Sequence, residues 1–324
     1  MDFKNSKRKP EVRNNLDEES KIEDSKPNII HRPVMPDQAL ELLAIRPAGT
    51  YIDATIGEGG HAEEILKRLR GGRLLGIDRD PRALELARQR LDAFEEKLVV
   101  LRGNFADIDT LHAVSGFPAA DGMLADLGMS SLQVDDPARG FSFSRSGPLD
   151  MRMGSDTEIA AEQLVNQSHE RDLADMIFQL GEERHSRRIA RAIVKARPIR
   201  TTTELAQVVS RAIPYRAGLH QIHPATRTFQ ALRLAVNKEL ENLGVFLSKA
   251  LAVLAPGGRL VILSFHSLED RMVKQAFRSW QLEGCARILT RKVLRPSEDE
   301  VRPNPRARSA KLRAAEKLGP RGAF

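Results

Sequence analysis

Short apolar segments alternate with helix-like segments through the first part of the chain. The apolar runs are residues 51–54, 74–78, 98–101 and 122–126. Between the first two runs, from Ala62 to Leu69, apolar residues recur at positions i, i+3, i+4 and i+7, which predicts one buried face of a helix. Short, almost continuously apolar strands separated by helices are typical of a parallel sheet that is covered on both faces. The pattern therefore predicts an α/β fold.

The alternation is interrupted after Asp126. The next clear buried strand, residues 260–263, begins more than 130 residues later, whereas a crossover helix with its loops needs about thirty. We therefore predict an inserted helical domain at 135–224, within a sheet domain formed by 31–134 and 225–324. The second part of the sheet domain is expected to begin with a long helix from Phe229 to Leu240. It is expected to end in a hairpin of 286–293 with 309–315.

Composition narrows the class of protein. Residues 1–30 carry many charges and few large apolar groups, so they are predicted to be a disordered tail. No apolar run is long enough to span a bilayer or to act as a signal peptide, and the single cysteine, Cys285, fits a reducing cytoplasm. The 324 residues have a formal charge of +7 and a pI near 9.7. This charge favours a polyanionic partner without identifying one.

A glycine-rich loop, Asp53 to His61, lies between the first predicted strand and the next helix. Glycines suit a tight turn that a ligand can approach. Asp78 ends the second strand 21 residues after Gly57, where its carboxylate would accept hydrogen bonds from two ribose hydroxyls. A simple tight turn is the alternative.

The same loop also fits a loose dinucleotide fingerprint, Gly57-x-Gly59-x-x-Ala62, so a nicotinamide oxidoreductase is a rival function. Glu58 lies inside the loop. Its charge would repel a pyrophosphate but attract the cationic end of S-adenosylmethionine, which favours the latter cofactor.

The loop is one of ten motifs that run in order along the chain. They are His31–Met35, Asp53–His61, Gly76–Pro81, Asp126–Ser131, Arg139–Phe143, Gly147–Arg152, Gly181–Arg184, His223–Gln230, Ser264–Arg271 and Asn304–Ser309. Together they are specific, and the chain resembles the MraW (RsmH) family of ribosomal RNA small subunit methyltransferases from about residue 31 to residue 316. One departure is Leu132, where relatives often carry proline, and it affects the loop that leads to Gln133.

The resemblance implies a Rossmann-like methyltransferase sheet that binds S-adenosylmethionine, with an inserted all-helical domain for substrate recognition. It also implies N4-methylation of a cytosine in the decoding centre (the P-site region) of 16S rRNA, on an assembled or nearly assembled small subunit. A homodimer is compatible with this assignment. The implied cofactor contacts are Gly59, Gly60, His61, Asp78, Phe105, Asp126 and Gln133.

Two residues at the ends of predicted strands are candidates for the transfer step. A cytosine amine is a poor nucleophile because its lone pair is delocalised into the ring, so acceptors on its N–H groups and good positioning would help. Asp126 ends the fourth strand, where chain order reverses and ligands bind. It would act as such an acceptor, bind the cofactor or cap the following turn. His266 follows the fifth strand and would orient the base, accept a proton or cap the next helix.

A stripe of basic residues predicts an RNA-binding surface. Its members recur at three- and four-residue spacing on one helical face: Arg184, Arg187, Arg188, Arg191 and Lys195. No acidic residue lies between Arg184 and Arg200, which favours contacts with phosphates. The alternative is that this helical face is solvated and that its basic residues pair with acidic residues elsewhere in the chain. Arg227, in the His223–Gln230 motif, is a further RNA-binding candidate.

Other polar and aromatic groups are more ambiguous. A C-terminal basic run would bind RNA or pair with acids: Arg302, Arg306, Arg308, Lys311 and Arg313. Phe141, Phe143 and Phe229 suit core packing better than stacking on bases. His220 and His223 lack acidic or cysteine partners, so no metal site is predicted.

Three functions explain these observations to different extents. A nicotinamide oxidoreductase would explain the glycine loop but not the basic stripe. A non-catalytic ribosome-assembly factor would explain the basic stripe but not the cofactor loop. A methyltransferase accounts for both, and its target base would have to leave its stack to reach the methyl donor.

Overall fold

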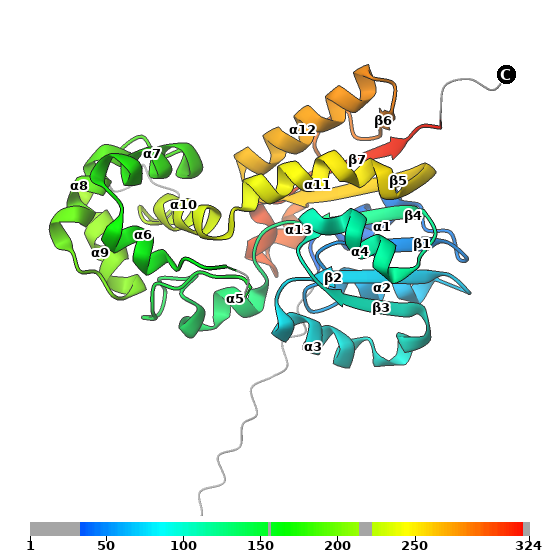
Figure 1. The fold of residues 1–324 in the computed structure, drawn as a ribbon, viewed down its shortest axis with the longest axis horizontal. Coiled ribbons are helices and arrows are strands. Elements are labelled where there is room, and N and C mark those ends of the chain that lie inside the picture. The colour runs from blue at the N-terminus through cyan, green and yellow to red at the C-terminus, as the bar shows by residue number, and fades with distance from the viewer. Residues whose placement is uncertain (1–32, 155–156, 214–221, 320–324) are drawn as a thin grey trace, which may run out of the picture. The chain divides into compact units, whose positions relative to one another are not determined.

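The computed structural model describes residues 33–154, 157–213 and 222–319, so the predicted tail, His31, Arg32 and His220 lie outside the described residues. A seven-stranded sheet has the order β3-β2-β1-β4-β5-β7-β6 (Figure 1). The strands are β1 (Thr50–Asp53), β2 (Arg73–Asp78), β3 (Leu98–Arg102), β4 (Ala120–Asp126), β5 (Leu254–Ser264), β6 (Ala286–Ile288) and β7 (Lys311–Lys317). No helix in the described ranges is long and apolar enough to cross a membrane.

The five predicted apolar runs are confirmed as β1 to β5, which pair in parallel. β7 is antiparallel to both β5 and β6, which confirms the predicted C-terminal hairpin and places β7 inside the sheet and β6 at its edge. β1 pairs with both β2 and β4. Chain order therefore reverses between β1 and β4.

Successive side chains of each strand point to opposite faces. Tyr51 packs in one buried cluster and Ile52 in another, on the two sides of the sheet. Helices α1 (Pro36–Leu43), α2 (Gly60–Arg68) and α3 (Pro81–Arg90) contribute to the first cluster. Helices α4 (Ile108–Ser115), α11 (Glu239–Val253) and α12 (Ser267–Leu282) contribute to the second. The sheet is therefore covered on both faces, as its apolar strands predict.

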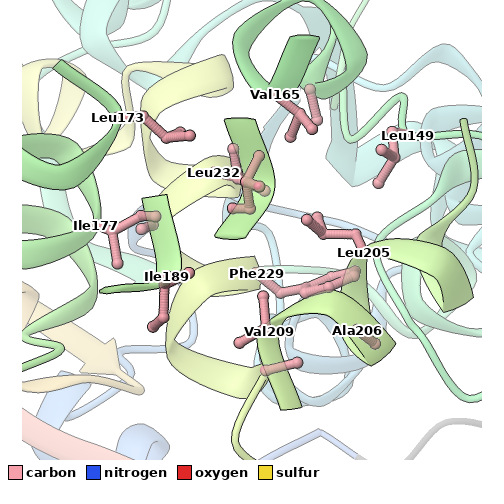
Figure 2. Close-up of a cluster of buried hydrophobic side chains, with 14 of the residues drawn as sticks. Leu149, Val165, Leu173, Ile177, Ile189, Leu205, Ala206, Val209, Phe229 and Leu232 are labelled. Atoms are coloured by element: carbon pink, nitrogen blue, oxygen red, sulfur yellow. The ribbon is translucent and has the colours of Figure 1, made fainter. Parts of the chain in front are cut away.

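Five helices form a separate buried cluster. They are α6 (Ala161–Gln167), α7 (Glu170–Gly181), α8 (Ser186–Ala196), α9 (Thr202–Ala212) and α10 (Thr226–Asn237). Leu173, Ile189 and Leu232 point into this cluster in Figure 2. The expected inserted segment is thus helical and has a core of its own. Short elements complete the chain: η1 (Asp92–Lys97), η2 (Phe105–Asp107), α5 (Ser131–Asp135), η3 (Pro137–Arg139), α13 (Glu298–Val301) and η4 (Pro305–Ser309).

The predicted helix from Phe229 to Leu240 is wrong. α10 ends at Asn237, and Lys238, with φ of 50°, separates it from α11. Phe229 packs among the inserted helices, whereas Leu243 of α11 packs on the sheet. α10 therefore lies with the helical cluster, although the expected boundary at residue 225 assigned it to the sheet domain. The apolar periodicity continues through both helices and does not reveal that the packing partner changes.

Candidate active site

A pocket opens at the carboxyl ends of β1, β2 and β4, beside the reversal of chain order. Asp53, Asp78 and Asp126, the last residues of these strands, line it. Open parallel sheets bind ligands at such a crevice. The other walls include the loop before α2, residues 127–131 with Gln133, and the first turns of α11. The geometry thus brings the glycine loop, Asp78 and Asp126 together, as the sequence predicts.

The glycine loop brings main-chain atoms to the wall of the pocket. Gly57 and Gly59 have φ of 51° and 84°, in the region that favours glycine. Gly60 and His61 line the pocket, whereas Gly59 is not among the described lining residues. Gly59 forms the turn itself, because its N–H donates to Ile56 O at 2.8 Å. Two of the three contacts predicted in this loop therefore reach the pocket.

Asp78 holds the loop in place. Its Oδ2 accepts a hydrogen bond from Gly57 N and its Oδ1 accepts one from Asp80 N, both at 2.9 Å. Burial raises the pKa of Asp78 to about 6. Each carboxylate oxygen can accept more than one hydrogen bond. Asp78 thus fixes the loop and keeps capacity for ribose hydroxyls.

Three titratable side chains meet beside this loop. His61 Nε2 lies 3.5 Å from Asp126 Oδ2, and Asp53 and His61 are buried. Burial raises the pKa of Asp53 to about 7. Within the described part of the chain, neither ring nitrogen of His61 nor Asp126 Oδ1 has a hydrogen-bond partner, although all three atoms are buried. Buried polar atoms are normally paired, so these atoms mark a place for a polar ligand.

Asp53 was not among the predicted contacts. The sequence offered one signal, since Asp53 begins the glycine-loop motif and lies within the first apolar run, residues 51–54. Asp53 is 1% exposed, and its Oδ1 accepts a hydrogen bond from Thr55 N at 3.2 Å. The pocket floor is therefore more acidic than the predicted contacts alone suggest.

Phe105 and Gln133 also line the pocket. The Phe105 ring meets Phe246 edge-on, with 5.2 Å between centroids. Gln133 Oε1 accepts from Ser130 N at 3.1 Å, and Nε2 donates to Asp80 Oδ2 at 3.3 Å. The capping box of Ser130 and Gln133 forms despite Leu132. Gln133 thus orders this loop and keeps one amide hydrogen for a ligand.

His266 caps α12. Its Nδ1 accepts a hydrogen bond from Glu269 N at 3.4 Å, which leaves the ring proton on Nε2. Nε2 lies 3.2 Å from Glu269 Oε1 but is buried without a hydrogen-bond partner among the described residues. His266 is not among the described residues that line the pocket. Uptake of a proton at Nδ1 would break the cap. The geometry therefore favours the cap over the catalytic role that the sequence also allowed.

One wall of the pocket was missed by the sequence reasoning. Met153, Glu239, Asn242 and Glu269 line it. Glu239 Oε1 accepts from Arg233 Nε at 2.8 Å. Burial raises the pKa of Glu239, against the opposing effect of the Arg233 guanidinium. No local pattern marks this wall, because packing of the inserted segment, α11 and α12 brings its residues together.

The predicted basic stripe is exposed. Its members are Arg184, just before α8, and Arg187, Arg188, Arg191 and Lys195 on that helix. Arg191 Nε lies 3.5 Å from Glu170 Oε1, and such exposed pairs contribute little. The other four have no ion pair within the described ranges. The stripe is therefore free to meet an external polyanion.

The remaining candidates are mostly paired or buried. Arg227 Nη1 donates to Glu182 O at 3.3 Å. In the C-terminal run, Arg302, Arg306 and Arg313 pair with Asp299, Asp135 and Asp270. These three arginines therefore pair with acidic residues, which is one of the two alternatives that the sequence left open. Phe141 and Phe229 are buried and Phe143 meets Phe229 edge-on, which confirms core packing.

Comparisons with known proteins give a matching family model and named relatives. Residues 28–318 match a family model described as the MraW methylase family. A relative from Syntrophobacter fumaroxidans called Ribosomal RNA small subunit methyltransferase H is 50% identical over 312 residues, covering 90% of this chain and 98% of the relative. A protein of the same name from Acidobacterium capsulatum is 52% identical over 295 residues, covering 89% and 98%. Among solved structures, TrmN from Thermus thermophilus is 15% identical, covers 88% of this chain and 48% of that chain, and has a TM-score of 0.43, which is too low to carry an argument.

Proposed function

The chain belongs to the MraW methylase family, and we propose that it methylates N4 of a cytosine in the decoding centre of 16S rRNA. It is an S-adenosylmethionine-dependent methyltransferase, which excludes the oxidoreductase and the non-catalytic assembly factor. The name of its relatives supports small-subunit rRNA as the substrate. The N4 atom, the decoding centre, the small subunit as the form of substrate and a cytoplasmic location are parts of the proposal.

The pocket fits S-adenosylmethionine. The buried, unpartnered atoms of His61 and Asp126 call for a polar ligand, and Asp53, Asp78 and Asp126 supply negative charge for its sulfonium and ammonium. Asp78 and the glycine loop would hold the ribose, and Phe105 would pack against an apolar ring surface. When bound, the cofactor supplies an activated methyl group. These residues bind and orient it.

Asp126 carries the proposal for the transfer step. It ends β4 at the pocket, and its Oδ1 is buried without a partner in the described part of the chain. A carboxylate at this place would accept a hydrogen bond from the cytosine amine and favour a pyramidal nitrogen with its lone pair exposed. After transfer, the extra proton on N4 would pass to this carboxylate or to water. His266 would act indirectly, by holding the start of α12.

The basic stripe supports RNA binding. Arg184, Arg187, Arg188, Arg191 and Lys195 would contact phosphates, with Arg227 as a further contact. The free charges on α8 would draw the subunit to the inserted helices and fix its orientation. The target cytosine would then leave its stack and enter the pocket.

The proposal is tested by incubating the protein with S-adenosylmethionine labelled in the methyl group. Small subunits, free 16S rRNA and large subunits serve as parallel acceptors. We expect label in small subunits, more than in free 16S rRNA, and none in large subunits. Cofactor binding without label in either small-subunit acceptor would contradict the proposed substrate.

A further inference from the structure

The first turn of α11 presents two polar side chains to the pocket. Glu239 and Asn242 are three residues apart and both line it. Side chains at this spacing are neighbours on a helix, with about 5–6 Å between their Cβ atoms. Neither residue belongs to the predicted cofactor contacts or to the ten sequence motifs. This face of the pocket has no role in the mechanism described above.

The hydrogen bonds of the two side chains determine what they offer to a ligand. Arg233 Nε donates a hydrogen bond to Glu239 Oε1 at 2.8 Å. The other carboxylate oxygen, Oε2, has no hydrogen-bond partner among the described residues. Asn242 Nδ2 donates to Asn237 O at 3.0 Å, which fixes the orientation of the amide. Its second N–H has no partner in the ranges that the structure describes. The wall therefore offers a carboxylate acceptor beside an amide donor.

This pair is complementary to a ring that carries an exocyclic amine beside an unprotonated ring nitrogen. Cytosine presents N4–H as a donor and N3 as an acceptor on this edge. Uracil presents O4 and N3–H at the same positions. Its O4 would face the Glu239 carboxylate without a proton between them, which disfavours binding.

The adenine of the cofactor shares this chemistry, since it carries N6–H beside N1. Phe105, the residue proposed to pack against an apolar ring surface of the cofactor, contacts α11 at Phe246. Phe246 lies seven residues after Glu239, or about 10 Å along the helix. Glu239 instead pairs with Arg233 of α10. Met153 also lines this end of the pocket. Its backbone N–H donates a hydrogen bond to Oδ1 of Asn237, which is also in α10, at 2.8 Å. The wall thus belongs to the end that the inserted segment builds, away from Phe105.

We propose that Glu239 and Asn242 form the subsite for the target base and read the amine edge of a cytosine that has left the RNA stack. Glu239 accepts one N4–H, Asn242 donates to N3, and the second N4–H remains for Asp126. This inference rests on the proposed function and names the residues that select its base.

The test compares Asn242→Ala and Glu239→Gln with wild type and with Glu241→Gln, an exposed acid on the same turn. Calorimetry gives the affinity for S-adenosylmethionine. Single-turnover methylation of small subunits at saturating cofactor gives the rate. Competition by small subunits with uracil in place of the methylated cytosine gives the preference for the base. Thermal unfolding checks the fold, and Asn242→Ala decides the test if loss of the Arg233 partner unfolds Glu239→Gln.

We expect both variants to keep their cofactor affinity and to lose about tenfold or more in rate, the effect of an unpaired hydrogen-bonding group. They should also lose most of the preference for cytosine over uracil, while Glu241→Gln behaves as wild type. Weakened cofactor binding with a rate restored by saturation would assign the wall to adenine and overturn the inference. Unchanged rate and preference would overturn it too. Failure of the wild-type protein to methylate cytosine N4 would instead refute the proposed function.

Discussion

Replacement of Asp53 by asparagine is expected to stabilise the cofactor-free protein at neutral pH but not in acid. Burial raises the pKa of Asp53 from 3.8 to about 7. As pH rises, this carboxyl ionises first in the unfolded chain, so the folded state loses stability between about pH 4 and pH 7 and the loss is constant above that. A shift of about three pKa units corresponds to about 4 kcal/mol. Asparagine removes this net cost, which already includes the attraction between Asp53 and His61, and keeps an acceptor for Thr55 N, so about 4 kcal/mol is the upper limit.

Urea unfolding at several pH values measures the effect. The free energy of unfolding of Asp53→Asn should exceed that of wild type by about 2–4 kcal/mol near pH 8, and the difference should fall below about 1 kcal/mol near pH 4.5. Glu85→Gln, an exposed substitution on α3, should show no such trend. A difference between Asp53→Asn and wild type that does not change with pH would refute the reasoning, because the buried carboxyl would then not titrate in this range.

Three further predictions concern cofactor binding, RNA binding and transfer. Asp78→Ala should weaken S-adenosylmethionine binding by about 2–3 kcal/mol in calorimetry, because the ribose loses its acceptor. It should also lower stability, because Gly57 N and Asp80 N lose theirs. Joint replacement of Arg187, Arg188 and Arg191 by alanine should flatten the salt dependence of small-subunit binding by up to about one unit of slope per lost contact. Asp126→Asn should reduce cofactor affinity and slow single-turnover methylation; saturating cofactor should restore the part of the rate lost through affinity, and the remaining loss reports the missing charged acceptor for the amine.

Each of these predictions has a result that contradicts it. Unchanged affinity in folded Asp78→Ala would remove Asp78 from the site. An unchanged salt slope would make the basic stripe an ordinary solvated surface, and Arg171→Ala, an exposed arginine on α7, is its control. For Asp126, a saturated rate within about threefold of wild type at unchanged affinity would end both functional roles.

The parts of the fold that depend on neighbours in sequence were predictable. Apolar runs located β1 to β5, because strands buried on both faces need almost continuous apolar sequence. Asp80 caps α3 with Pro81 in its first turn, and Thr201 and Glu204 form a capping box at the start of α9; both are short local sequence signals. Local hydrogen bonds and steric preferences decide such features.

Features that depend on distant partners were not predictable in this way. α10 has the apolar period of any buried helix, and only its packing among the inserted helices assigns it to them. Arg306 and Arg313 belong to one basic run, but each pairs with an acid more than 40 residues earlier in the chain. Glu239 reaches the pocket because α10 ends just before it. Sequence patterns record local preferences, and these contacts follow from tertiary packing.

Nucleoside mass spectrometry of 16S rRNA tests whether the protein methylates N4 of a cytosine in the decoding centre. Small subunits lacking the modification are incubated with the protein and S-adenosylmethionine that carries a deuterated methyl group. The position of the deuterated methyl group is then located by mass spectrometry of 16S rRNA fragments. We expect deuterated N4-methylcytidine at a single position within the decoding centre. A deuterated methyl group on a ring carbon, on another base or outside the decoding centre, or none in 16S rRNA, would contradict it.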